Sequence, residues 1–415
     1  MKIHTILTKH EPLRENCAAA RRVVEFNGRF AREDIPTMHK HLLALPLLLL
    51  ALFALWPAAA QSVPGGPLVL WIAGDLYAAD PGTPTLPPRP LTQMGVISGP
   101  TLSPAGNWVA FKAAAPVGLA ALDRIQTDGL IAAYDLPADL YLLDPRSGSL
   151  ALVASQPANA SLLAEGVPDN ATVRSAPSWS PDGTRLAWME FPFGAAEARL
   201  YQYDLGQRLV AATGITAPVI EGRAPSVIWG EGGIALNLGL SATGNQEFRL
   251  ITADGAALST VTLRPTFNES VLIDEWVQDG ERSLFGVLLS SGWWTLFDPV
   301  TGQQMPAGRV PELAARAVPE TSLALRFAVN SDVGFYWEAS DPLPSEAAAP
   351  AFPSGPSRTT LAPDGRSVAF IGYPDYTSAA LWQNEAVVSI AGTGGAGLPV
   401  GAVLWGPVYW RLPAG

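Results

Sequence analysis

The strongest constraint on the fold of this chain is a short motif that recurs along it. Its clearest copy reads Ser175-Ala-Pro-Ser-Trp-Ser-Pro-Asp-Gly-Thr-Arg-Leu-Ala-Trp188, and related copies span 99–111 and 358–370. In each copy, Pro sets φ for a turn, Asp can bond back to the backbone, and Gly accepts a positive φ. The motif therefore predicts a strand, a tight turn and a second apolar strand.

Weaker copies of the motif continue the series at a nearly regular spacing. All gaps but the first, which is 77 residues, lie between 42 and 49 residues. This spacing is typical of one blade of a β-propeller. The anchor positions of the copies are Ser103, Ser180, Trp229, Trp276, Val318, Ala362 and Trp405.

A second motif alternates with the first and supplies another strand. It reads Asp75-Leu-Tyr-Ala-Ala-Asp-Pro, then Asp139-Leu-Tyr-Leu-Leu-Asp-Pro, then Arg199-Leu-Tyr-Gln-Tyr-Asp, and weaker copies follow. A further apolar stretch, such as 150–154, supplies a fourth strand. Four strands per unit, repeated seven times, predict an all-β, seven-bladed β-propeller of four-stranded antiparallel blades. Six blades is the alternative, because the copy near Val318 is poor and 341–357 is rich in Pro, Ala and Ser.

The two ends of the repeat region complement each other. Residues 68–92 supply the later strands of a blade, and 402–412 supply a first strand and room for a second. Pairing them would close the ring and remove exposed strand edges.

The two motifs together resemble the WD-like repeat of TolB-type propellers, over residues 68–412. The resemblance implies a propeller alone. We therefore expect neither the α/β domain that precedes the propeller in TolB nor the hydrolase domain that follows it in prolyl-oligopeptidase-like enzymes. The resemblance therefore implies an architecture and leaves the function open.

The N-terminal region has the pattern of an export signal. An apolar run over 42–56 follows Met38-His-Lys-His41 and precedes Ala58-Ala-Ala60, which is typical of a signal peptide with its cleavage site. We expect residues 1–37 to be a non-native extension or a short cytoplasmic tail, 38–60 a signal peptide or signal anchor, and 61–415 the propeller. The protein would then be periplasmic, extracellular, or tethered to the outer face of the cytoplasmic membrane.

The distribution of reactive residue types limits the chemistry of the propeller region. The chain has four histidines, one cysteine and four lysines, and all of them except Lys112 precede residue 42. This pattern argues against Ser-His-Asp or Cys-His catalysis and against His- or Cys-ligated metals in the propeller. We expect no cofactor, no metal and no catalytic residue. Residues 61–415 carry a net charge of −14, which disfavours nucleic acid as a partner.

Arginines recur just before the predicted innermost strands. If they converge on the channel mouth, they could bind a carboxylate, a phosphate or an acidic peptide. The alternative is that each pairs with a nearby acid or lies on the solvated rim, which their uneven offsets favour. The four candidate ligand-binding residues are Arg174, Arg223, Arg316 and Arg358.

The long first gap places an insertion, 113–138, on the same predicted mouth. It contains Gly118-Leu-Ala-Ala-Leu-Asp-Arg-Ile-Gln126, which predicts an amphipathic helical turn. The insertion is either a lid or partner-docking element, or a tolerated surface loop.

These observations favour an exported, non-enzymatic binding or scaffold protein for a protein, a peptide or an envelope polymer. One alternative is a carboxylate- or Tyr-based enzyme on a glycan at the channel mouth, which needs two facing acids. The adjacent Asp274 and Glu275 cannot form that pair alone, because neighbours on a strand point to opposite faces. Another alternative is a membrane-anchored sensor domain that keeps residues 1–60.

Overall fold

The computed structural model divides the chain into two units, 1–60 and 61–415, and every residue that it describes belongs to the second. The predicted N-terminal extension (1–37) and the predicted signal segment (38–60) therefore lie outside the described residues. Among the described residues, no helix is long and apolar enough to cross a membrane. The described ranges are 67–127, 136–220, 222–240, 246–251, 257–264, 271–279, 282–289, 294–304, 316–317, 323–327, 335–339, 359–362, 367–371, 377–383, 386–394, 398–405 and 410–411.

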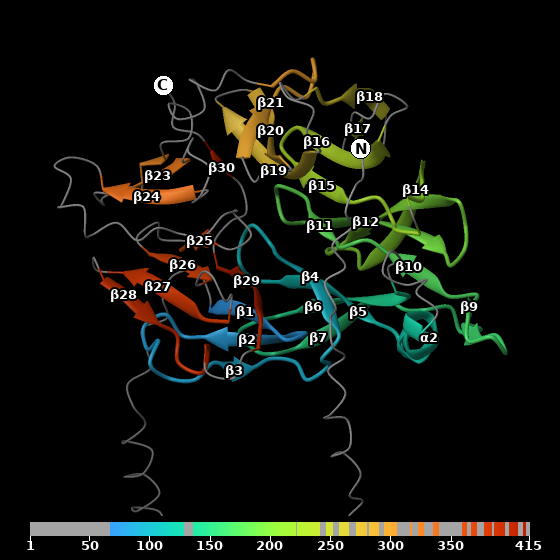
Figure 1. Ribbon diagram of the computed structural model, residues 1–415, viewed down its shortest axis with the longest axis horizontal. Helices are drawn as coiled ribbons and strands as arrows, with labels where there is room; N and C mark the ends of the chain where they lie inside the picture. The colour runs from blue at the N-terminus through green and yellow to red at the C-terminus, as the bar shows by residue number, and fades with distance from the viewer. Residues whose placement is uncertain are drawn as a thin grey trace, which may run out of the picture. The chain divides into compact units, whose positions relative to one another are not determined.

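The described residues fold almost entirely into antiparallel β-sheets, most of them four-stranded (Figure 1). The first strand of each sheet either contains an anchor of the first motif or ends one residue before it. These strands are β4 (Ile97–Leu102), β10 (Thr172–Arg174) with β11 (Ser178–Trp179), β15 (Val227–Gly230), β19 (Val271–Asp279), β22 (Arg316–Ala317), β25 (Thr359–Leu361) and β29 (Val400–Leu404).

In every sheet except that of β29, the second strand comes after the turn of the first motif, and in all of the sheets the third strand overlaps a copy of the second motif. The second strands are β5 (Val109–Ala114), β12 (Arg185–Pro192), β16 (Gly233–Leu240), β20 (Arg282–Leu289), β23 (Leu323–Phe327), β26 (Val368–Ile371) and β1 (Leu68–Ile72). The third strands are β6 (Ala138–Leu143), β13 (Glu197–Asp204), β17 (Gln246–Ile251), β21 (Trp294–Phe297), β24 (Phe335–Ala339), β27 (Ala379–Gln383) and β2 (Asp75–Ala79).

A fourth strand completes five of these sheets. The fourth strands are β7 (Leu150–Ala154), β14 (Leu209–Pro218), β18 (Ala257–Thr262), β28 (Ala386–Ser389) and β3 (Arg89–Pro90). The elements outside this pattern are α2 (Pro116–Thr127), β8 (Ser161–Leu162), β9 (Pro168–Asp169) and β30 (Trp410–Arg411). The expected four-stranded antiparallel sheets are confirmed for most of the described region. The β22–β24 sheet has three strands there, and the β10–β14 sheet has five because its first strand is interrupted.

The turns of the first motif adopt the predicted geometry. In the copy at Ser180, Gly183 has φ +68° and its N–H donates to the Ser180 carbonyl at 2.8 Å. The Asp182 carboxylate accepts from the Ser180 hydroxyl at 2.6 Å and from the Thr184 N–H at 3.0 Å. Gly106 makes the same turn in the first copy, with φ +72°. The turn of the copy in 358–370 lies outside the described residues.

Strands from both ends of the repeat region share one sheet, as predicted. β29 pairs antiparallel with β1, with Leu70 opposite Val403, so the order is β29-β1-β2-β3. A second C-terminal strand does not join this sheet, because β1 already occupies the position next to β29. Instead, β30 runs parallel to β19 of a different sheet, with Trp410 opposite Val277.

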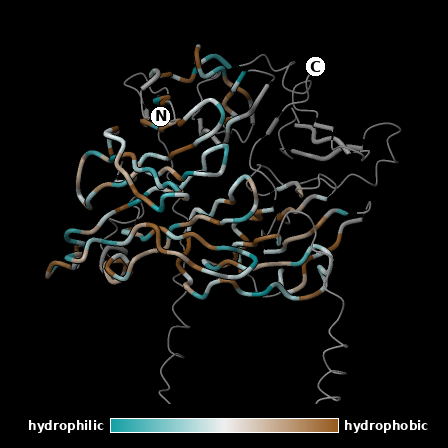
Figure 2. Tube along the Cα trace, turned by 180° about the vertical axis from the view of Figure 1, so that it is seen from behind, coloured by the Kyte–Doolittle hydropathy of each residue, from teal (hydrophilic) through white to brown (hydrophobic). Residues whose placement is uncertain are grey.

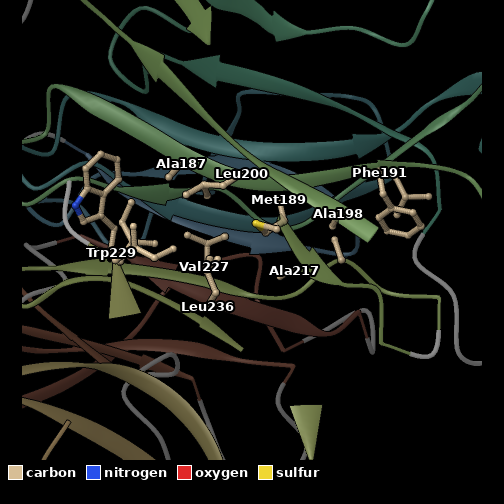
Figure 3. Packing of buried hydrophobic residues seen from close by; sticks show 13 residues of the cluster. Ala187, Met189, Phe191, Ala198, Leu200, Ala217, Val227, Trp229 and Leu236 are labelled. Atoms are coloured by element: carbon tan, nitrogen blue, oxygen red, sulfur yellow. The ribbon is translucent and has the colours of Figure 1, made fainter. Parts of the chain in front are cut away.

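Apolar clusters join five pairs of described sheets that follow each other around the repeat. Because side chains alternate along a strand, a sheet can present two apolar faces, and four of the sheets contribute to two clusters; apolar and polar residues are accordingly interspersed along the trace (Figure 2). The largest cluster lies between the β10–β14 and β15–β18 sheets (Figure 3). Other clusters join the β1–β3 sheet to the β4–β7 and β25–β28 sheets, the β4–β7 sheet to the β10–β14 sheet, and the β15–β18 sheet to the β19–β21 sheet.

Buried tryptophans add directional bonds to these apolar junctions. The Trp179 indole N–H donates to the Thr101 carbonyl of the preceding sheet at 3.2 Å, and Trp276 donates likewise to Ile228 at 3.1 Å. The Trp276 ring lies so close to Gly230 that a Cβ there would approach it to 2.4 Å. These tryptophans therefore pack neighbouring sheets against each other.

Candidate functional site

The four arginines singled out from the sequence have different surroundings. Arg174, in β10, is buried, and Arg223 is exposed in a bend whose backbone bonds to Ile220. Arg316 lies in β22 opposite Leu325, and Arg358 lies outside the described residues. Their convergence on one anion site remains a prediction, but Arg174 already has a partner within the protein.

The Arg174 side chain donates hydrogen bonds to three other segments of the chain. Its Nε donates to Oε2 of Glu190 on β12 at 2.9 Å, and its side chain is only 4% exposed against 17% for Glu190. The remaining guanidinium nitrogens donate to the backbone carbonyls of Ala138 and Ser155. A buried guanidinium that is paired and hydrogen-bonded in this way fixes geometry more than it adds stability.

Lys112 and Gln156 extend this polar connection between the β4–β7 and β10–β14 sheets. The buried Lys112 ammonium donates to the Arg174 carbonyl at 3.0 Å. The Gln156 side chain accepts from the Thr172 N–H at 2.7 Å and donates to the carbonyls of Ala138 and Thr172. The only lysine after residue 42 therefore has a structural role, and it is buried away from any solvent-facing site.

A cleft of ≈ 490 Å³ opens beside this connection. It lies at the turn between β12 and β13, which are the second and third strands of their sheet, so it falls on the face where the sequence predicted a mouth. The lining residues are Thr172, Glu190, Phe191, Pro192, Ala195, Ala196, Glu197, Arg199 and Tyr201.

Strand register explains why the polar residues of the cleft share one face. Arg174 pairs with Glu190 across β10 and β12, and Glu190 pairs with Arg199 across β12 and β13. Positions 197, 199 and 201 alternate with the buried Ala198 and Leu200, so Glu197 and Tyr201 lie on the same face as Arg199. A basic–acidic–basic row therefore crosses the sheet.

Arg199 is the residue of this row that sequence reasoning missed. It occupies the first position of the second motif, where two other copies have Asp75 and Asp139. Those aspartates bind the chain just after the fourth strand: Asp75 accepts from Met94 N–H at 2.6 Å, and Asp139 from Gln156 N–H at 2.7 Å. Arg199 is exposed and lines the cleft instead. The departure from Asp in this copy was the available signal.

Glu190 and Tyr201 are hydrogen-bonded to each other. Glu190 accepts hydrogen bonds from the Tyr201 hydroxyl and, at 3.1 Å, from the Trp188 indole N–H, in addition to Arg174. Burial raises the pKa of Tyr201 above its ordinary value of 10.0, and the Glu190 carboxylate raises it further. Tyr201 also stacks on Trp188, with ring centroids 6.1 Å apart. Tyr201 is therefore held protonated, as a donor.

Two polar groups of the cleft are already hydrogen-bonded within the protein. The partly buried Glu190 carboxylate accepts from three side chains, and Tyr201 is a poor general base at neutral pH. The exposed Arg199 guanidinium, the exposed Glu197 carboxylate and an apolar floor around Phe191 are the groups that remain for a ligand. Among the described residues, no cluster of three or more His, Cys, Asp or Glu side chains could hold a metal ion.

Comparison with known proteins identifies the architecture only. No family model and no curated protein matches this chain. Solved structures that resemble it include the β-propeller domain of the Trilobed protease from Pyrococcus furiosus, with 12% identity over 71% of this chain and 82% of the other and a TM-score of 0.38.

Two further similar structures differ in activity. A protein assigned as TolB from Agrobacterium tumefaciens is 15% identical over 59% of this chain and 80% of its own, with a TM-score of 0.34. An oligogalacturonate lyase from Vibrio parahaemolyticus is 10% identical over 71% and 79%, with a TM-score of 0.37. The all-β fold of mostly four-stranded antiparallel sheets is seen in this chain itself, and at these identities and TM-scores the likeness does not extend to function.

Proposed function

We propose that residues 61–415 form a seven-bladed, TolB-like β-propeller that is exported and binds a protein, a peptide or an envelope polymer without chemical conversion. Support for the architecture comes from the seven motif copies and from the shared β29-β1-β2-β3 sheet. Support for export comes from the sequence of 38–60, which is either cleaved or kept as a membrane tether.

The main support for a binding role is which polar groups of the cleft between β12 and β13 are left for a ligand. Its partly buried acid and its tyrosine are bonded to each other, whereas Arg199 faces the cleft with no hydrogen bond or ion pair among the described residues. An exposed guanidinium above an apolar floor suits a carboxylate on a chain-like ligand, such as an acidic side chain of a peptide.

The test uses the full chain and an array of acidic, neutral and basic synthetic peptides together with soluble cell-wall glycan fragments. We expect acidic peptides or acidic glycans to bind, and mass spectrometry to find no product. Arg199→Ala should weaken binding roughly tenfold, the loss of about 1.4 kcal/mol expected for one charged hydrogen bond.

Arg146→Ala is the matched control, because Arg146 is exposed on a neighbouring sheet away from the cleft. Equal binding by the two variants would refute the cleft as the site. Product formation that is lost in Tyr201→Phe and Glu197→Gln would instead establish the enzymatic alternative.

A further inference from the structure

Exposed apolar side chains gather on two neighbouring insertions, α2 and the β8–β9 hairpin. Leu119 on α2 is 37% exposed, and on the hairpin Leu162, Leu163 and Val167 are 37%, 48% and 40% exposed. α2 packs against both β8 and β9, and Figure 1 shows α2 and β9 side by side, so these four residues belong to one region of the surface. Contiguous apolar surface of this kind marks an interaction site more often than scattered apolar residues do.

Both insertions are held rigidly. The hairpin closes through Leu163 N–H to the Val167 carbonyl at 3.0 Å and Gly166 N–H to the Leu163 carbonyl at 2.8 Å. Gly166 has φ +80°, a conformation that other residues adopt only under strain. α2 packs closely against the chain at Pro137, because a Cβ on Gly118 would lie 2.8 Å from the Pro137 carbonyl oxygen. A surface that is ordered before binding loses little conformational entropy when a partner arrives.

The β8–β9 hairpin carries only negative charge, and the single Asp and single Arg of α2, Asp123 and Arg124, offset each other. Residues 155–173 include Glu165 and Asp169 and contain no Lys or Arg. Glu165 is exposed at the hairpin turn, between Leu163 and Val167. Acidic groups at this position disfavour an anionic membrane surface, and they disfavour a second copy of the same acidic patch. They favour a partner that combines apolar side chains with Lys or Arg.

We propose that α2 and the β8–β9 hairpin form a docking surface for a partner protein segment in which apolar side chains alternate with basic ones. The apolar side chains of the segment lie on Leu119, Leu162, Leu163 and Val167, and its basic groups pair with Glu165 and Asp169. The surface is distinct from the cleft beside Arg199, so it stands or fails independently of the function proposed for that cleft.

The test measures binding of a short fluorescent peptide in which Leu and Lys alternate to the full chain, by anisotropy. The comparison peptides replace Lys by Glu, or Leu by Ser. We expect the Leu–Lys peptide alone to bind well. The double variant Leu163→Ser/Val167→Ser should weaken it roughly tenfold or more, because each buried aliphatic side chain contributes about 1.5–3 kcal/mol at full burial.

The matched control is Leu86→Ser/Leu209→Ser, which removes equally exposed leucines elsewhere, at 61% and 55% exposure. It should leave affinity unchanged, and circular dichroism should show both double variants folded. Glu165→Lys should weaken the Leu–Lys peptide and strengthen the Leu–Glu peptide. Gly166→Ala should also weaken binding, since it strains the turn without removing an apolar group.

Equal effects of the two double variants would overturn the proposal, as would equal binding of the Ser–Lys peptide, which would indicate charge attraction alone. Two other outcomes would reassign the surface. Binding to zwitterionic lipid vesicles that Leu163→Ser/Val167→Ser abolishes would make it a membrane contact. Self-association in sedimentation that the same variant abolishes would make it an interface between copies.

Discussion

The β10–β14 sheet has two neighbours and joins them by different means. Toward the β15–β18 sheet the centre of the junction is apolar, with Met189, Leu200 and Val227 packed together (Figure 3), and polar contacts such as the bond from Arg249 to the Thr216 carbonyl lie around it. Toward the β4–β7 sheet, aromatic packing around Trp188 gives way to the polar connection of Lys112 and Arg174. Apolar burial is non-directional, whereas a buried hydrogen-bonded pair holds only one arrangement. The cleft opens at the junction whose geometry is fixed by polar bonds.

The largest expected effect comes from breaking the polar junction on one side. Arg174→Ala leaves Glu190 without its cation and removes one donor from the Ala138 and Ser155 carbonyls, so the free energy of unfolding should fall by about 3–5 kcal/mol. Chemical denaturation measures the loss. Arg174→Met combined with Glu190→Leu should recover most of it, because no unpaired charge remains; a double variant as unstable as the single one would contradict this account.

The apolar junction should lose somewhat less from a comparable truncation. Leu200 is fully buried, and Leu200→Ala removes its transfer energy and leaves a cavity, for a loss of about 2–5 kcal/mol. Leu200→Met, which nearly conserves volume, should lose less than about 1.5 kcal/mol. If the Met and Ala variants were equally unstable, packing at this junction would be far more specific than we infer.

A smaller effect distinguishes the junctions by pH. Because the pKa of Tyr201 is raised in the folded protein, its contribution to stability is complete below pH 10.0 and is lost as pH rises through the folded pKa. Tyr201→Phe should cost about 1 kcal/mol at neutral pH through the lost hydrogen bond. Above pH 10, the stability of the variant should also fall less steeply with rising pH than that of the parent. Thermal unfolding midpoints measured over a series of alkaline pH values test this. An unchanged alkaline profile would argue against the Glu190 contact.

The smallest effect concerns the turns, which are remote from both junctions. Burial alone would raise the pKa of Asp182, but hydrogen bonds from Ser180 and Thr184, with the charge of Arg185, outweigh it and lower the pKa below 3.8. This contribution is present above pH 3.8 and is lost as pH falls through the folded pKa. Asp182→Asn should therefore reduce stability by less than about 1 kcal/mol at neutral pH, since Asp182 is largely solvated. Acid titration of the unfolding midpoint is the measurement, with Asp144→Asn as the parallel case.

Local chemistry made much of the fold predictable. The Pro-Asp-Gly turns identify themselves because Gly183 needs φ > 0 and Asp182 bonds within its own turn. The spacing of the motifs predicted the insertion, and its residues predicted a helical turn over 118–126, where the structure has the longer helix α2. The complementary ends of the repeat predicted the pairing of β29 with β1. The seven-blade count and the closed ring stay predictions.

The candidate site was harder to predict because it depends on register between strands distant in sequence. Nothing near Arg174 reveals that β12 brings Glu190 opposite it, so an arginine considered for ligand binding has a structural partner instead. The bulge in β19 between Ile273 and Glu275 likewise breaks the simple alternation assumed for Asp274. Arg199 did carry a signal, as the residue that replaces Asp in its motif.

The sheet that unites β29 with β1 has a consequence for the order of assembly during synthesis. Leu68–Ile72 leaves the ribosome early, but its partner Val400–Leu404 is among the last segments to be made. Until then one edge of β1 has no strand to bond with, and an unpaired edge invites pairing with other chains. Nascent molecules would therefore depend on a chaperone or on rapid completion, and a chain that stops short of Val400 should aggregate.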